Sequence, residues 1–400
     1  MLKRIIKPKI IEKEIKNLSI FEEKLPENSK IIAQNSKGIV FLHNGRLKIK
    51  STNEDSWTRF NALLLAEKIS EIFVRNNIIV ATISQLGRVV VDEKIDIEEV
   101  ISKIIEETGV IVDLSNPFSQ TEYLGWRIFI QIEPAGQLEI TATRVVKVPS
   151  ITKIVPELLT ARILTLLFLP STAVIIGPPG SGKSTLLNSI VVEVSKLWPQ
   201  LHIAIVEPVK ELLIKGGWAA RMVGPVSELT RLTVRYKRPD FLVIGELLTN
   251  DIWTFIEAGR SGVPTIATFH SPNIWKCLRS IADSMKMHLR NADERTVLRY
   301  IDLFIVSRKR IEGWKITRYI DSIYLSDSQR LIPIYLHDIS PVFLPEEDFK
   351  KLLPENSMLG KTEKLYEFLK KLYKINTKAY DFEEIKPIPV LTELATLPQV

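Results

Sequence analysis

Glycine, lysine and hydroxyl residues occur together in residues 177–185, Gly-Pro-Pro-Gly-Ser-Gly-Lys-Ser-Thr. This spacing fits G-x-x-x-x-G-K-[ST], a loop whose backbone amides wrap a phosphate group. Lys183 is then expected to reach the β- and γ-phosphates of a nucleotide, and the Ser184 hydroxyl to bind Mg²⁺. An ordinary glycine-rich turn is the alternative explanation. The predicted nucleotide-binding residues are Gly177, Pro178, Pro179, Gly180, Ser181, Gly182, Lys183, Ser184 and Thr185.

The segments on either side of this loop favour the phosphate-binding explanation. Residues 172–176 are apolar and mostly β-branched, which predicts a buried strand. Apolar residues after the loop recur at helical spacing, so a helix is expected there, and its N-terminus would add positive potential. These residues are Leu186, Leu187, Ile190, Val191 and Val194.

Carboxylates follow two further predicted strands. Residues 203–206 run into Glu207, with Glu211 four positions later, and residues 241–244 run through a glycine into Glu246. Carboxylates at strand ends beside a phosphate loop can hold a metal ion or orient water. Glu246 is the candidate for Mg²⁺ or water and Glu211 for general base, while Glu207 carries less weight. Solvated loop carboxylates are the alternative.

Two more residues at strand ends could serve the same site. Gly245 would let the backbone pass close to a nucleotide. His270 follows the predicted strand 265–268 and could change its contacts when a γ-phosphate is lost. A lone histidine is otherwise a hydrogen-bonded loop residue.

Composition indicates a globular protein of two or three domains. The chain has 400 residues, of which 45% are hydrophobic and 25% charged. The net charge of +7 is mild for this length and does not by itself argue for nucleic acid. The single cysteine, Cys277, excludes an intrachain disulfide and a cysteine-based zinc cluster. The Ile- and Lys-rich composition with few Cys and Met residues is typical of a thermophile, an archaeon among the candidates.

No targeting or membrane segment is expected. Residues 1–16 have no uninterrupted apolar core, so they do not resemble a signal peptide. The most apolar stretch, 158–176, contains Arg162 and Pro170 and leads into the phosphate loop. A cytoplasmic protein is expected, peripheral at the inner face of the cell membrane through its partners.

The first part of the chain predicts a basic arm over 1–30 and a smaller mixed α+β domain over 31–146. Asn44-Gly45 between two apolar runs predicts a hairpin. The expected elements are strands at 39–42 and 47–49, a helix from Phe60 to Phe73, strands at 78–83 and 88–91, a helix over 97–105 stopped by Gly109, and strands at 126–132 and 138–146.

The remaining chain predicts a linker and connecting helix over 147–170, an α/β domain with a largely parallel sheet over 171–345, and a helical tail over 346–400. Its expected elements are strands at 172–176, 202–206, 241–244 and 265–268, a helix over 274–285, antiparallel strands at 303–307 and 314–324, a helix over 363–373 and a Pro-rich end.

Several ordered motifs over residues 115–325 resemble those of the ATPases of type II and type IV secretion systems, which also serve type IV pili and archaella. Besides the phosphate loop they are Ser115-Asn116-Pro117-Phe118 with Gly125-Trp126-Arg127, Thr143-Arg144, Glu207 to Leu212 as an Asp box, Arg238-Pro239-Asp240 with Gly245-Glu246 as Walker B, and Ser261-Gly262 with Thr268-Phe269-His270 as a His box.

The chain departs from the family pattern at four positions. Pro208 replaces an aspartate of the Asp box, and Leu248 and Val263 replace an arginine and a histidine. Tyr236 stands where the family has arginine, although Arg235 is adjacent. A divergent ATPase is therefore expected.

The resemblance implies an α/β fold, a P-loop (RecA-like) ATPase domain preceded by the smaller domain, acting as a hexameric ring. It implies ATP and Mg²⁺ as cofactors, with Ser184 and Glu246 at the metal, and a membrane platform protein as partner. Arg127 and Arg144 would then approach the nucleotide, because a guanidinium stabilises charge on a transferred phosphoryl group. The catalytic residues implied are Lys183, Glu211, Glu246, His270, Arg127 and Arg144.

Two other functions remain open. A nucleic-acid-dependent motor for DNA export, helicase or packaging work could use the basic runs 308–310 and 235–238, although no nucleic-acid motif is evident. A non-catalytic ring subunit could explain the departures. No direct nucleic-acid partner is expected under the first interpretation.

Overall fold

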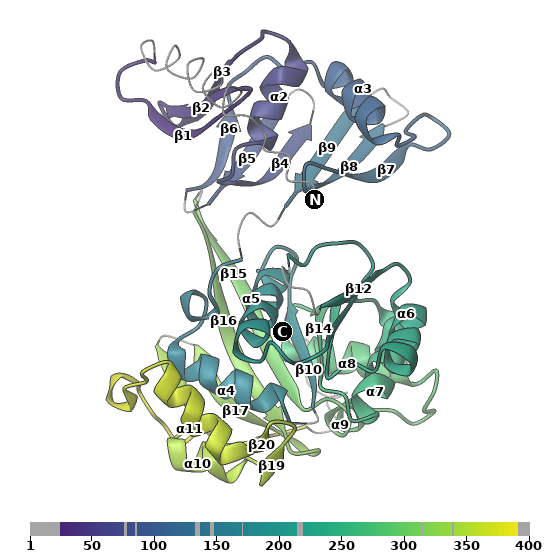
Figure 1. Cartoon of the computed structure of the whole chain (residues 1–400), viewed down its shortest axis with the longest axis vertical. Coiled ribbons are helices and arrows are strands. Elements are labelled where there is room, and N and C mark those ends of the chain that lie inside the picture. Colours follow the sequence, from purple (N-terminus) through teal and green to yellow (C-terminus); the bar gives the residue numbers. More distant parts are fainter. Residues whose placement is uncertain are drawn as a thin grey trace, which may run out of the picture. The chain divides into compact units, whose positions relative to one another are not determined.

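A computed structural model describes residues 25–75, 78–84, 86–132, 137–144, 148–169, 171–213, 219–313, 315–337 and 340–390. The chain divides into two compact units, Met1–Val146 with Ile311–Ile316 and Lys147–Arg310 with Thr317–Val400 (Figure 1). Most of the predicted basic arm and the last ten residues of the Pro-rich end lie outside the described residues.

The first unit is built on one sheet with strand order β1-β2-β3-β6-β5-β4-β9-β8-β7 in its described part. Helices α2 (Ser56–Leu64) and α3 (Ile97–Thr108) contact each other and cover the sheet (Figure 1). The strands are β1 (Lys30–Asn35), β2 (Gly38–His43), β3 (Arg46–Ser51), β4 (Ile69–Arg75), β5 (Ile78–Ile83), β6 (Gly87–Val91), β7 (Phe118–Tyr123), β8 (Trp126–Ile132) and β9 (Leu138–Thr143).

Local chemistry fixes the ends of these elements. The Asp55 carboxylate accepts a hydrogen bond from the Thr58 amide at 2.7 Å and begins α2. Gly109 ends α3 with φ of 69°, in the left-handed region that favours glycine. Asn44 and Gly45 have φ of 49° and 73°, as a two-residue hairpin turn requires, so the predicted hairpin is confirmed.

The helix predicted from Phe60 to Phe73 is wrong in its second half. Helix α2 ends at Leu64, and Ile69 already begins β4, which pairs with β5 on one side and β9 on the other. The apolar residues of the two elements together imitate helical spacing, but pairing on both edges decides the conformation. Strands β1 and β7 were missed because both lie at the edges of the sheet, where most of their residues are exposed or half-buried.

The second unit is a doubly covered α/β sheet. Its described strands follow the order β12-β11-β13-β14-β10-β15-β16-β17-β18, and neighbours from β12 to β15 are parallel. These strands are β10 (Thr172–Gly177), β11 (Ile203–Glu207), β12 (Ala220–Val223), β13 (Phe241–Leu247), β14 (Thr265–His270), β15 (Leu303–Glu312), β16 (Lys315–Ser326), β17 (Arg330–His337) and β18 (Pro341–Phe343).

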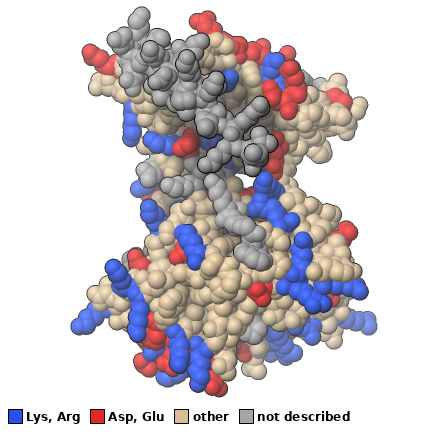
Figure 2. Space-filling view, in the orientation of Figure 1, with Lys and Arg blue, Asp and Glu red and all other residues tan. Residues whose placement is uncertain are grey.

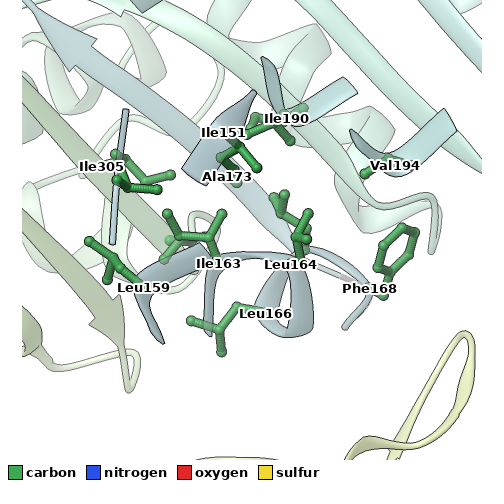
Figure 3. Packing of buried hydrophobic residues seen from close by; sticks show 14 of the residues in the cluster. Ile151, Leu159, Ile163, Leu164, Leu166, Phe168, Ala173, Ile190, Val194 and Ile305 are labelled. Atoms are coloured by element: carbon green, nitrogen blue, oxygen red, sulfur yellow. The ribbon is translucent and has the colours of Figure 1, made fainter. Parts of the chain in front are cut away.

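Buried residues on opposite faces of this sheet form two apolar clusters. On β10, Ala173 and Ile175 belong to one cluster, and Val174 and Ile176 to the other. Figure 3 shows part of the first cluster, in which side chains of α4 pack against Ala173 and Ile305. The helices are α4 (Glu157–Leu167), α5 (Lys183–Leu197), α6 (Val226–Leu232), α7 (Ile252–Arg260), α8 (Ile274–Met285), α9 (Glu294–Leu298), α10 (Glu346–Lys351) and α11 (Thr362–Leu372).

The segment after residue 345 is part of this core. Helix α11 packs on α4, and the buried side chains of Phe349, Tyr366 and Leu369 join the cluster that contains Ala173. The predicted helix of this segment is confirmed, while the short helix α10 was not predicted.

The predicted fold class is confirmed, since a mixed α+β unit precedes a parallel α/β unit with its glycine loop after a central strand. No helix in the described part of the chain has the length and apolar character that crossing a membrane requires.

Candidate functional site

The glycine loop lies between the end of β10 and the start of α5, as the sequence predicts. Gly180 and Gly182 have φ of 71° and 95°, which residues with a side chain rarely adopt. A Cβ on Gly177 would lie 2.4 Å from the Ser307 carbonyl oxygen, so only glycine fits there. The glycines therefore shape the loop for both conformational and packing reasons.

A buried pair of hydroxyls fastens this loop to β15. The Oγ atoms of Ser181 and Ser307 are 2.7 Å apart, and Ser307 Oγ donates to the Ile176 carbonyl oxygen at 3.2 Å. Since Ser307 donates to the carbonyl, Ser181 is the donor in the hydroxyl pair. The loop is thus held in position by protein contacts.

Lys183 begins α5 and its side chain is buried within the loop. Its Nζ donates to the carbonyl oxygens of Gly177 at 2.9 Å and Pro178 at 3.2 Å. Burial lowers the pKa of Lys183 to about 8, although the nearby carboxylates of Glu246 and Glu211 act in the opposite direction.

His270 connects Lys183 to Glu246. The parallel pairing of β10 with β14 places His270 directly opposite Gly177. Its Nδ1 lies 3.3 Å from Lys183 Nζ, and its Nε2 lies 3.0 Å from Glu246 Oε1. An ammonium can only donate, so Nδ1 accepts and the imidazole proton on Nε2 faces the carboxylate. Side chains from three elements, α5, β14 and β13, therefore meet at this edge of the sheet.

Glu207 has a structural position. Its buried carboxylate accepts hydrogen bonds from the backbone amides of Glu211 at 2.9 Å and Leu212 at 3.1 Å, and pairs with Arg221 at 3.1 Å. Burial raises the pKa of Glu207, while the two amides and Arg221 oppose that rise. The carboxylate thus holds the segment that contains Glu211.

Gly245 has a packing role that the sequence did not predict. A Cβ at this position would lie 2.8 Å from the Cβ of Glu207 on the neighbouring strand β11. The glycine therefore leaves room for Glu207. Its expected close approach to a nucleotide stays a prediction.

Arg127 and Arg144 lie in the first unit. Arg144 Nε donates to the Ile69 carbonyl oxygen at 3.0 Å, and the guanidinium lies over the Trp126 ring at 4.4 Å. Burial lowers the pKa of Arg144 to about 10. Arg127 stands on β8 opposite Glu122 of β7. The structure brings together Lys183, Glu211, Glu246 and His270 in the second unit.

Three of the substituted motif positions have clear surroundings. Leu248 and Tyr236 are exposed, and Val263 packs against the buried cluster that contains Val174. No group of three or more His, Cys, Asp or Glu residues suited to a metal ion occurs in the described ranges.

Sequence analysis missed two cations at the loop, Lys309 on β15 and Arg318 on β16. Arg318 Nε donates to the Gly180 carbonyl oxygen at 2.9 Å. Lys309 Nζ lies 3.4 Å from the point that a Cβ on Gly180 would occupy. At least 120 residues separate these two cations from the loop in the sequence. They come close to it only because β15 pairs with β10 in the sheet.

Comparison with curated proteins finds relatives in conjugal transfer. The chain is 25% identical over 152 residues to the conjugal transfer protein TrbB of Rhizobium radiobacter, covering 37% of this chain and 47% of that protein. It is 24% identical over 148 residues to a probable TrbB of Sinorhizobium fredii (strain NBRC 101917 / NGR234), covering 36% and 45%. The chain spans about half the length of the curated relatives it matches. No protein-family model matches it.

Comparison with solved structures finds two ATPases and a pilus retraction motor. The ATPase DotB of Legionella pneumophila has 16% identity and a TM-score of 0.49, with 81% of this chain and 90% of that chain covered. The pilus retraction motor PilT with bound ADP has 15% identity and a TM-score of 0.46, with 78% and 91% covered. The VirB11 ATPase of the Brucella suis type IV secretion system has 17% identity and a TM-score of 0.36, with 66% and 92% covered. The resemblance predicted from the motifs is thus confirmed as a similarity to conjugal transfer proteins.

Proposed function

We propose that this chain is an ATP-hydrolysing motor that powers assembly of a pilus-like filament or a secretion or transfer machine at the membrane. The observation that carries the proposal is the connected set Lys183, His270 and Glu246 beside the glycine loop. It joins a phosphate-binding loop to a carboxylate at the end of a neighbouring strand, which is what a nucleoside triphosphatase requires.

The residues present fit ATP and Mg²⁺. Gly180 and Gly182 give the loop the left-handed backbone that wraps a phosphate, and Lys183 supplies a buried cation. Ser184 and Glu246 would hold Mg²⁺, and phosphate oxygens and water would complete its shell, as this ion prefers. The bound ion would neutralise charge on the β- and γ-phosphates.

Each remaining residue has a role in this scheme. Glu211 would accept the proton of the attacking water as general base. A bound γ-phosphate would compete with His270 for the Lys183 ammonium, so the histidine contact would differ between ATP and ADP. The contact between the imidazole of His270 and the Glu246 carboxylate would then change as well.

Arg127 and Arg144 would act from the first unit as charge-compensating arginines. A guanidinium there would stabilise charge on the transferred phosphoryl group. A subunit that uses such residues would work in a hexameric ring. The ring would lie in the cytoplasm against the membrane and move a membrane platform protein.

The direct test is steady-state ATP hydrolysis with Mg²⁺, comparing the wild type with Glu246→Gln. We expect turnover in the wild type and a loss of about 10²–10³-fold in the variant, because the amide cannot hold the metal or orient water as the carboxylate does. Glu228→Gln, at an exposed position of α6, is the matched control and should keep wild-type turnover.

The mass of the protein should be measured in the same buffer with ATP. A hexamer with turnover that depends on Glu246 supports the motor. Nucleotide binding without turnover in the wild type would instead indicate a non-catalytic ring subunit.

A further inference from the structure

Strand β15 runs beside the phosphate loop with one face turned toward it. Ser307 on this face contacts Ser181 of the loop. Side chains of a strand alternate between faces, so Lys309, two positions on, points to the same side as Ser307. Arg308, between them, instead pairs with Asp321 at 2.9 Å. The basic run 308–310 is therefore not one solvated surface.

The Lys309 ammonium lies at the loop near Lys183. It is 3.4 Å from the position that a Cβ on Gly180 would take. Its charge also contributes to the lowered pKa of Lys183, after burial and against the two carboxylates. No carboxylate in the described ranges forms an ion pair with Lys309. Two ammonium groups thus stand close together at a loop shaped for phosphate.

Arg318 on β16 supports the same part of the loop from the neighbouring strand. Its Nε donates to the Gly180 carbonyl oxygen, and its Cδ would lie 3.4 Å from a Cβ on Gly182. The side chain therefore binds Gly180 and lies beside Gly182, both of which have left-handed φ. This hydrogen bond fixes the orientation of the Gly180 peptide group in the loop.

We propose that the β15–β16 strand pair is a second wall of the nucleotide site, with Lys309 as a phosphate-binding residue and Arg318 as a positioning residue for the loop. The ligand is the polyphosphate chain of a nucleoside di- or triphosphate. This inference rests on the proposed function and adds two residues to its site. Like-charge repulsion between Lys183 and Lys309 is then relieved when the phosphates bind.

The test is equilibrium binding of fluorescent ATP and ADP analogues, with unlabelled AMP as competitor, to the full chain. Lys309→Ala should weaken ATP and ADP binding by about tenfold, as expected for loss of a charge-assisted hydrogen bond. Lys309→Arg should retain most of the affinity, and AMP should compete equally well with wild type and variant. Arg310→Ala, one position further on the same strand, is the matched control for loss of one positive charge.

Arg318→Met keeps an unbranched stem over Gly182 and removes the donor to Gly180. We expect KM for ATP to rise severalfold while kcat stays within about twofold. The reason is that a misplaced loop weakens binding of ATP and of the transition state equally. Arg318→Lys should restore part of the affinity, since an ammonium can donate to the same carbonyl. An unchanged KM in Arg318→Met would exclude the positioning role.

The outcomes separate this inference from the proposed function. If the wild type binds nucleotide and Lys309→Ala binds ATP as tightly as Arg310→Ala does, the second wall is excluded and the motor proposal stands. If Lys309→Ala loses the same affinity for ATP and for AMP, the lysine acts only through its long-range charge. That result would also exclude the second wall. A wild type that binds neither ATP nor ADP would overturn both.

Discussion

At the scale of single residues, Lys183 shows how burial can give a site its own pH dependence. Its pKa is lowered to about 8, so the ammonium loses its proton in an accessible range. The Kd for ADP should rise about tenfold between pH 7 and pH 9, because the deprotonated amine no longer attracts phosphate. Titrations with a fluorescent ADP analogue across this range measure the slope.

Lys183→Arg is the control for this prediction. A guanidinium stays charged throughout the range, so its ADP affinity should be weaker but nearly independent of pH. If the Kd of the wild type for ADP is equally independent of pH, Lys183 keeps its proton to a much higher pH.

Arg144 offers a second residue-scale prediction, because its guanidinium already has partners within the first unit. Arg144→Ala should lower the free energy of unfolding by about 2 kcal/mol through the lost hydrogen bonds and the lost contact with Trp126. Urea unfolding followed by tryptophan fluorescence measures the change. Reduced ATP turnover of the folded variant would in addition support the proposed charge-compensating role, and unchanged stability would contradict the structural one.

Gly245 gives a third prediction of the same kind. Gly245→Ala should destabilise the protein by about 1–3 kcal/mol, since the new methyl group would overlap Glu207 Cβ. Gly262→Ala, at a position with open space but a φ of 88°, measures the separate cost of a side chain in left-handed backbone. A loss below about 0.5 kcal/mol at Gly245 would contradict this account.

At the scale of elements, the segment after residue 345 contributes side chains to the core of the second unit. Tyr366 of α11 is fully buried in the cluster that also contains Ala173 of β10, while Phe368 on the same helix is about half exposed. Tyr366→Ala should lower the free energy of unfolding by about 3–5 kcal/mol, and Phe368→Ala by less than about 1 kcal/mol. Thermal melting of both variants distinguishes a core helix from a peripheral one, and similar melting temperatures would exclude the core role.

At the scale of the whole molecule, charge bears on the alternative motor that works on nucleic acid. The net charge is +7, and on the face shown in Figure 2 Lys and Arg lie in separate groups, several beside Asp or Glu. We therefore expect ATP turnover to change less than twofold when DNA is added at moderate salt. Strong stimulation by DNA that disappears as salt is raised would favour the nucleic-acid motor.

The sequence alone determined the site elements that depend on local chemistry. The glycine loop, its lysine and the flanking strand and helix follow from residue types within 25 positions, because turn geometry and hydrophobic periodicity are local. The ends of parallel strands also lie along one edge of a sheet, so Glu246 and His270 could be assigned to the same place from their positions after apolar runs.

Only the tertiary structure decided which distant groups meet. It placed Lys309 and Arg318 at the loop. It showed that Glu207 is buried and binds the backbone near Glu211. It also showed that β4 is a strand where the spacing predicted a helix. Sheet pairing brings together residues that are far apart in the chain, and the register of that pairing sets which side chains face one another. Neither is encoded in the spacing of neighbouring residues.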